Sequence, residues 1–210
     1  MNDLTASRLL ATSLRAFSGA RYSVAKLIAA HPAASLQSRG DVFHTLARAI
    51  VGQQISVKAA DTVWARFCAA LGDVSSAAVL QQDPEALRAC GLSARKVEYL
   101  CDLAAQQHQA GRLDPSLWVD WDDEAIIQAL IAIRGIGRWS AEMFLLFYLL
   151  RPNVLPLADI GLVKAIALHY HAGERLPRAA LIELAAVWQP WCSVATWYLW
   201  RSLDPVPVEY

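Results

Sequence analysis

Apolar residues recur every three or four positions along almost the entire chain, and no other feature restricts the fold as strongly. The pattern is clearest between residues 43 and 71. The apolar residues that follow this spacing are Phe43, Leu46, Ala47, Ile50, Val51, Val57, Ala60, Val63, Trp64 and Phe67. Such spacing puts an apolar stripe along a helix, and no segment shows the sustained alternation of a strand. The sequence therefore predicts an all-α fold of about ten short helices.

Residues that end or begin helices divide this pattern. Gly52-Gln53 interrupts the stretch just described, which predicts two helices or one strongly bent helix. Gly91 is a helix stop and Ser93 caps the next helix. Pro152 and Pro156 stop the helix that precedes them. The remaining expected helices cover 86–90, 94–111, 125–133, 139–150, a segment that opens at Asp159, 178–188 and 193–203.

We expect a single helical domain, 1–210, built as two lobes around a cleft. The first lobe comprises roughly residues 41–155 and contains a helical hairpin at 125–150. The second lobe joins residues 1–40 to residues 156–210. Neither an internal repeat nor a long linker interrupts this arrangement.

Composition excludes several classes of protein. Hydrophobic residues make up 56% of the 210 residues, which argues against disorder. Basic and acidic residues number 19 each, so any contact with nucleic acid must draw partly on backbone donors. No apolar run reaches the roughly 18 residues of a membrane span. The start, MNDLTASRLLATSLRAF, lacks the layout of a secretory signal, and four scattered cysteines indicate reduced thiols in a cytoplasm.

The stretch IRGIGRWSAEM, residues 133–143, holds two glycines between expected helices. Gly135 and Gly137 allow a tight turn and the close approach of another molecule to the backbone. The next helix then begins with N–H groups that attract an anion. With Arg138 and Ser140 nearby, this turn could hold a phosphate at low net charge. An ordinary turn with glycine caps explains the same pattern equally well.

Asp159 is the candidate carboxylate beside this turn. A helix over 139–150 is about 18 Å long. The connector 151–158 reaches up to roughly 27 Å when extended, so it can carry Asp159 back to the hairpin. The competing explanation is that Asp159 simply caps the helix DIGLVKAIALHY. The two roles are compatible, because a helix N-terminus also keeps a carboxylate ionised.

The run LIAIRGIGRWSAEMFLLFYLLRPNVLPLADIGLVKAI resembles the hairpin, loop and catalytic aspartate of the helix-hairpin-helix DNA glycosylase superfamily. FHTLARAIVGQQISVKAADTVWARF and GLSARKVEYLCDLA are similar to its alkylation-repair branch, DNA-3-methyladenine glycosylase II. The similar segments are spread from about residue 41 to residue 203, which is most of the chain. The resemblance implies the helix-hairpin-helix glycosylase fold.

Catalytic and pocket roles follow from this resemblance. Asp159 falls on the aspartate that supports an oxocarbenium-like sugar. Trp139 falls where enzymes with lyase activity carry a nucleophilic lysine, which implies simple hydrolysis. Trp200 falls on an aromatic residue of the base pocket. For Trp139 and Trp200, packing in the core is the alternative. Met143 stands where a bacterial relative has a pocket tyrosine, so the base-recognition surface differs there.

DNA-binding roles follow in the same way. Gln54 falls on the residue that wedges into the duplex, and its neighbour Gln53 competes for that role. The phosphate clamp falls on Gly135, Ile136, Gly137, Arg138 and Ser140. Backbone carbonyls of Ile131, Ile133 and Ile136 match positions that hold a Na⁺ or K⁺ ion in similar hairpins.

Other parts of the superfamily pattern have no counterpart in this sequence. Only Cys192 lies near the C-terminus, so the four-cysteine iron–sulfur cluster of some branches is excluded, and no other cofactor is expected. Helix signals begin within the first ten residues, which leaves no room for the β-domain that precedes the helical core in some relatives.

The sequence thus predicts a monofunctional DNA glycosylase that flips alkylated bases out of duplex DNA, the first step of base excision repair. The alternative is a non-enzymatic helix-hairpin-helix module that only binds DNA. A binding module needs neither Asp159 nor the pocket aromatics, which is why we favour the enzyme. We further expect a monomer without membrane contact, located in a bacterial-type cytoplasm and associated with the nucleoid.

Overall fold

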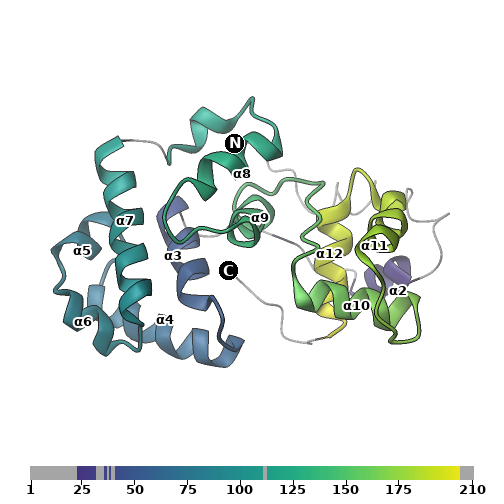
Figure 1. The fold of residues 1–210 in the computed structure, drawn as a ribbon, viewed down its shortest axis with the longest axis horizontal. Helices are drawn as coiled ribbons and strands as arrows, with labels where there is room; N and C mark the ends of the chain where they lie inside the picture. Colours follow the sequence, from purple (N-terminus) through teal and green to yellow (C-terminus); the bar gives the residue numbers. More distant parts are fainter. Residues whose placement is uncertain (1–22, 32–35, 37, 39–40, 111–112, 204–210) are drawn as a thin grey trace. The chain divides into compact units, whose positions relative to one another are not determined.

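The computed structural model describes residues 23–31, 36, 38, 41–110 and 113–203 (Figure 1). Within these residues every regular element is an α-helix or a short 3₁₀ helix, which confirms the all-α prediction. The α-helices are α2 (Ser23–Ala30), α3 (Val42–Gly52), α4 (Val57–Leu71), α5 (Ser76–Gln81), α6 (Pro84–Ala89), α7 (Ala94–Ala110), α8 (Asp123–Ile131), α9 (Arg138–Phe147), α10 (Ile160–Tyr170), α11 (Arg178–Ala185) and α12 (Cys192–Arg201). The 3₁₀ helices are η1 (Pro115–Trp118) and η2 (Ala186–Trp188).

Most expected helix boundaries lie within a few residues of the observed ones. The chain breaks between α3 and α4 at the predicted Gly52-Gln53 pair. The hydroxyl of Ser93 caps α7 as predicted, accepting a hydrogen bond from the backbone N–H of Lys96 at 3.3 Å. The helix expected within the first ten residues, and the expected helix end at Gly111, lie outside the described residues.

Helix α9 is shorter than the sequence predicts. It ends at Phe147, whereas the expected helix continued to Leu150. Leu150 adopts a left-handed backbone conformation with φ of 52°. The backbone N–H of Arg151 donates to the carbonyl of Leu145 at 2.9 Å, and this bond closes the turn. Three short elements, α2, α5 and η1, were not predicted, because segments of four to eight residues show too little of the helical period to stand out.

Contacts between Cα atoms divide the chain into two compact units. Of the described residues, those within 39–144 form one unit, and those within 1–38 and 145–203 form the other. The division falls inside α9, between Phe144 and Leu145.

In the unit 39–144, α7 packs against α3 and α5, and α3 also packs against α4. The apolar faces of these helices form one core. Its largest fully buried side chains are Phe43, Leu46, Ile50, Phe67, Leu87, Leu100, Leu103 and Phe144. Trp118 of η1 packs edge-on against Phe144, with ring centroids 5.6 Å apart. This core supports the turn between α8 and α9.

In the unit that contains residues 145–203, α12 packs against α10 and α2. Trp188, Tyr198 and Ile28 are buried there at 1% exposure each. Helix α12 therefore forms the centre of this unit, and it supports the start of α10.

The four cysteines are free, as the scattered sequence positions indicate. Cys90 and Cys192 are buried, whereas Cys68 and Cys101 are partly exposed. Burial raises the pKa of all four thiols, that of Cys192 to about 11. They are therefore protonated and poorly reactive at neutral pH. None of the helices in the described ranges is both long and apolar enough to cross a membrane.

Candidate functional site

The turn between α8 and α9 depends on Gly135. Its φ is +89°, in the left-handed region that side chains disfavour. A Cβ atom at this position would lie 2.3 Å from Cγ of Tyr99, which comes from α7. Both the backbone conformation and the Tyr99 ring therefore require glycine.

Gly137 has a different role from Gly135. It is not in the left-handed region, and a Cβ atom built on it would meet nothing within 4 Å. Its backbone is exposed at the start of α9. The prediction that both glycines open the backbone thus fits Gly137, whereas Gly135 is needed for packing inside the protein.

Gln53 fastens this turn to the end of α3. Its side-chain Nε2 donates to the carbonyl of Gly135 at 2.9 Å and to the hydroxyl of Ser140 at 3.2 Å. Ser140 is only 2% exposed, and its hydroxyl already has Gln53 as a partner inside the protein. Ile136 is 4% exposed and anchors the turn in the core. Of the two glycines among the five predicted clamp residues, Gly137 is the exposed one.

The first N–H groups of α9 point out of the helix, because the first turn has no earlier carbonyls to bond. The positive end of the helix dipole lies at the same place. Gly137 leaves this end of the helix uncovered by any side chain of its own. This end of α9 therefore has the properties of an anion site made from main-chain donors.

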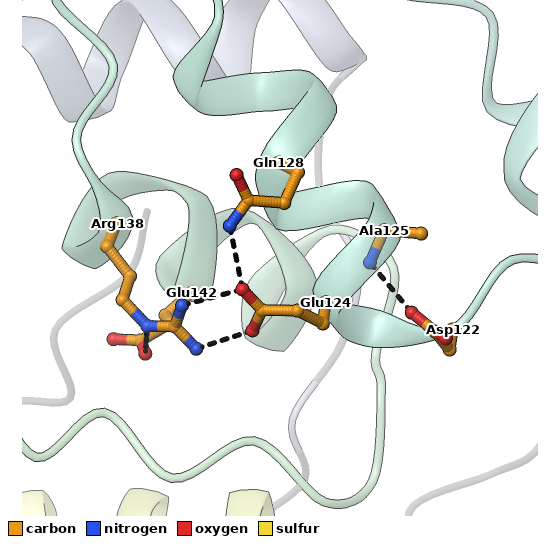
Figure 2. A network of polar contacts seen from close by, with 6 residues as sticks. All are labelled: Asp122, Glu124, Ala125, Gln128, Arg138 and Glu142. Atoms are coloured by element: carbon orange, nitrogen blue, oxygen red, sulfur yellow. Dashed lines mark hydrogen bonds and ion pairs between the residues drawn. The ribbon is translucent and has the colours of Figure 1, made fainter.

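Arg138, the first residue of α9, is held by two carboxylates (Figure 2). Its guanidinium makes two bonds to Glu124, of 2.9 and 2.7 Å, and Nε donates to Glu142 at 3.1 Å. The bonds from Arg138, followed by one from Gln128, lower the pKa of Glu124 to about 2. The positive charge of Arg138 is thus offset locally, and its expected contribution to phosphate binding stays a prediction.

Asp159 caps α10, as the sequence predicts. Its Oδ1 accepts a hydrogen bond from the backbone N–H of Leu162 at 2.7 Å. The same oxygen accepts a second hydrogen bond, from Nε1 of Trp200 at 2.8 Å. Two donors from α10 and α12 therefore fix the position of this half-buried carboxylate.

Close packing around Asp159 restricts it further. A Cβ atom on Gly161 would lie 3.1 Å from Oδ1 of Asp159 and 3.4 Å from the Trp200 indole. Trp200 also stacks on Phe147, with centroids 5.8 Å apart and planes 13° from parallel. The indole is thus held by a ring on one side and by a carboxylate at its edge.

The connector ahead of Asp159 is held by α12 as well. The hydroxyl of Ser193 accepts from the N–H of Val154 at 2.9 Å and donates to the carbonyl of Arg151. The N–H of Ser193 donates to the carbonyl of Pro152 at 3.0 Å. Ser193 and Trp200 are seven residues apart on one helix, which puts them on the same face. One face of α12 therefore positions both the connector and the carboxylate.

The other predicted pocket residues differ in exposure. Trp139 is half-buried at the second position of α9. Met143 is 2% exposed, so the surface that it offers to a base is small. The contribution of Trp139 and Met143 to a base pocket stays a prediction.

The structure separates the two adjacent glutamines. Gln53 uses its side chain inside the protein, as described above. Gln54 is exposed, and its φ of 58° is left-handed. An exposed side chain without a hydrogen bond to any described residue is the one available to a partner molecule. This favours Gln54 over Gln53 as the wedge.

Sequence reasoning missed several residues that shape these clusters, namely Tyr99, Lys96, Phe147, Gly161 and Ser193. Only Gly161 left a signal, because a glycine in the first turn of a helix lowers stability by up to about 1 kcal/mol and needs a reason. The others act through partners far away in the sequence.

The predicted alkali site depends on carbonyls. The carbonyl of Ile133 accepts from the N–H of Ile136 at 3.1 Å, so it already has one partner, although a carbonyl oxygen has a second lone pair. The ion stays a prediction. Across the described ranges, no group of three or more His, Cys, Asp or Glu side chains could hold a metal.

Comparison with known proteins gives a family and a fold. Residues 47–190 match the family described as "HhH-GPD superfamily base excision DNA repair protein". The chain is 33% identical over 190 residues to the putative DNA-3-methyladenine glycosylase YfjP of Bacillus subtilis, covering 87% of this chain and 66% of that protein.

Solved structures agree with this match. A Schizosaccharomyces pombe 3-methyladenine DNA glycosylase in complex with abasic DNA is similar with a TM-score of 0.79 and 25% identity, covering 91% of this chain and 96% of that one. A 3-methyladenine DNA-glycosylase from Archaeoglobus fulgidus is similar with a TM-score of 0.80 and 26% identity, and the match covers 96% of this chain and 72% of that one. These similarities confirm the helix-hairpin-helix glycosylase fold.

The two glycines of the turn should differ in their effect on stability. Gly135→Ala should lower the free energy of unfolding by about 2–4 kcal/mol, from a left-handed alanine and a clash with Tyr99. Gly137→Ala is the matched control, with a loss of at most about 1 kcal/mol. Urea denaturation of both variants measures the difference, and equal losses would contradict the distinct roles.

The ion pair of Glu124 should stabilise the fold in a defined pH range. A folded pKa of about 2, below the usual 4.5, adds stability that is present above pH 4.5 and lost as the pH falls toward 2. Glu124→Gln should therefore lower the melting temperature at pH 7 and not near pH 2. The effect is small because the pair is exposed, so melting is followed at low salt. In an Arg138→Met background the difference at pH 7 should vanish; a difference independent of pH would rule out this explanation.

Proposed function

The chain belongs to the HhH-GPD superfamily of base excision DNA repair proteins, and from that membership we propose that it is a DNA glycosylase acting on alkylated bases. Its substrates are bases of the 3-methyladenine and 7-methylguanine type in duplex DNA. The reaction is hydrolysis of the N-glycosidic bond after the base has been flipped out of the helix. Relatives that carry the name DNA-3-methyladenine glycosylase support this substrate class.

The observation that carries the proposal is the carboxylate of Asp159. Two hydrogen bonds to Oδ1 hold it in place, so it needs no rearrangement when charge develops nearby. Such a fixed negative charge stabilises a sugar that acquires oxocarbenium character as its base departs. A residue that only capped α10 would have no need of the second donor, Trp200.

The chemistry of the substrate suits a site that acts through one fixed carboxylate. An alkylated purine such as 3-methyladenine is cationic, and its glycosidic bond is already weakened. The protein then needs to extrude the base, exclude water from it and stabilise the sugar cation. Aromatic faces attract a cationic base, by about 0.5–2 kcal/mol for each good contact. Trp200 is proposed to line the pocket and at the same time to orient Asp159.

The reaction is proposed to be hydrolysis without strand cleavage. A lyase needs an amine that forms a Schiff base with the sugar. In the first turn of α9, the position that would carry a lysine holds Trp139. An indole nitrogen is not nucleophilic, so water is the attacking group, and Asp159 helps to orient it.

Duplex DNA is the proposed partner. The start of α9 around Gly137 binds a phosphate through main-chain N–H groups, and Gln54 fills the gap that the flipped nucleotide leaves. A DNA complex of the similar Schizosaccharomyces pombe protein supports this partner. We also propose a monomer that acts in the cytoplasm at the nucleoid, with a Na⁺ or K⁺ ion at the carbonyls of residues 131, 133 and 136. The surface that recognises the base is proposed to differ from that of the bacterial relative at Met143, where the relative has a tyrosine.

Asp159→Asn should abolish base release and leave the fold intact. Asparagine keeps an oxygen that accepts the bonds from Leu162 and Trp200, yet it carries no charge. We expect a loss of about 10²–10³-fold or more in the release of 3-methyladenine and 7-methylguanine from methylated duplex DNA. DNA binding, followed by fluorescence anisotropy, should stay near the wild-type value.

The control for this change is Asp122→Asn, which alters another capping aspartate, the one that accepts from the N–H of Ala125 at 2.7 Å. It should keep full activity. Undiminished base release by the Asp159 variant would refute its catalytic role. A wild-type protein that binds DNA and releases no base from a panel of lesions would favour the binding module instead.

Borohydride should trap no covalent adduct between the protein and DNA that contains 3-methyladenine or 7-methylguanine. Trapping requires an imine, and Trp139 cannot form one. A glycosylase with lyase activity, treated in parallel, serves as the positive control. The readout is a shifted band on a denaturing gel, and its appearance with this protein would refute the monofunctional mechanism.

A further inference from the structure

Gln54 occupies a backbone conformation that needs support. A residue with a Cβ atom is disfavoured in the left-handed region by roughly 1–2 kcal/mol. Such a conformation persists only where neighbouring groups fix it, and it is found preferentially at functional sites. Since φ of Gln54 is 58°, the contacts of the residues just before it are informative.

Lys96 of α7 supplies the first of these contacts. Its ammonium donates to the carbonyl of Val51 at 2.7 Å and to the carbonyl of Gln53 at 2.9 Å. Both carbonyls lie at the C-terminal end of α3, where the helix dipole is negative. The side chain is half-buried, and burial lowers the pKa of its ammonium. Charge-assisted bonds of this length offset that cost of burial.

Gln53 supplies the second contact. Its carbonyl is held by Lys96, and its side chain is held by Gly135 and Ser140 of the turn. The residue immediately before Gln54 is therefore fixed at its backbone and at its side chain. All of these groups belong to the unit 39–144, so the arrangement is complete within one body.

We propose that Lys96 is a positioning residue, which acts through Gln53 to present Gln54 to DNA at a fixed place relative to the phosphate-binding turn. This proposal rests on the proposed function. Without the ammonium, the end of α3 would lose both bonds to α7, and Gln54 would leave the left-handed conformation. The wedge and the phosphate contact would then no longer have a set separation.

The end of α4 shows that a helix in this protein can stop without such an arrangement. Gly72 adopts a positive φ of 73° at no cost to a side chain, and its N–H donates to the carbonyl of Cys68 at 2.9 Å. At position 54, two residues after the end of α3, a glycine would adopt the left-handed conformation without this strain. The chain instead has an exposed glutamine in a strained conformation and a half-buried lysine behind it. A contact between the side-chain amide of Gln54 and another molecule would explain both the strained backbone and the half-buried lysine.

A double-mutant cycle on two DNA substrates tests the proposal. Lys96→Met removes the donors, Gln54→Ala removes the wedge, and the double variant combines them. One substrate carries the alkylated base in a fully paired duplex. The other carries it opposite a tetrahydrofuran abasic analogue, where the duplex is already open and a wedge has little to do. Arg95→Met, an exposed change on the same helix with the same loss of charge, is the control.

On the paired substrate we expect each single variant to lose about tenfold in kcat/KM. The double variant should lose no more, because both changes remove the same wedge function. On the opened substrate every variant should stay within about twofold of the wild type. Lys96→Arg should recover part of the loss, whereas Arg95→Met should lose nothing. Losses that multiply in the double variant, or equal losses on both substrates, would overturn the proposal.

A binding measurement separates this proposal from the proposed function. 2-Aminopurine placed beside a tetrahydrofuran site brightens when a wedge unstacks it, whether or not a base is released. The wild type should raise the fluorescence, and Lys96→Met should not at saturating protein. A wild type that brightens the probe and releases no base would overturn the enzyme assignment and keep the role of Lys96. A Lys96 variant as bright as the wild type would overturn that role.

Discussion

The absence of a side chain at Gly135 is the constraint on which the unit 39–144 depends. Because Tyr99 occupies the space where a Cβ would lie, the turn approaches α7 closely and its carbonyl faces the end of α3. Gln53 can then reach that carbonyl, and Lys96 can reach the carbonyl of Gln53. A larger residue at 135 would move the turn and break the contacts that link Gly135, Gln53 and Lys96. The glycine therefore determines the position of Gln54, although the two residues are far apart in the chain.

Asp159 shows how one side chain can serve folding and chemistry together. The bond that starts α10 also sets the direction of the carboxylate, so the helix and the proposed catalyst cannot be positioned independently. Helix α12 adds a second restraint through Trp200 and holds the preceding connector through Ser193. A fixed carboxylate loses little on reaching the geometry that the reaction needs, which is what electrostatic preorganisation requires.

Local sequence patterns were enough to predict most helices and the capping role of Asp159. Both the spacing of apolar residues along a helix and the capping of its end depend on residues that are close together in the sequence. They could not separate Gln53 from Gln54, because the distinguishing bond joins residues 82 positions apart. They also could not show that Arg138 is held by Glu124, 14 positions earlier. The early end of α9 depends on a turn around Leu150 that the two prolines only suggest. Pairings of this kind are set by tertiary packing, and a single sequence has no local signal for them.

The ion pairs of Arg138 bear on how binding would respond to salt. Each phosphate neutralised by a free cationic side chain releases a condensed counterion and makes affinity fall with ionic strength, with a slope of about −0.9 for each contact on a log–log plot. A guanidinium already matched by Glu124 and Glu142 contributes little to that slope, and neutral backbone amides contribute none. If this chain contacts DNA mainly through backbone amides, as proposed, its affinity would change little with ionic strength. Proteins that bind DNA through basic grooves dissociate as the salt concentration rises.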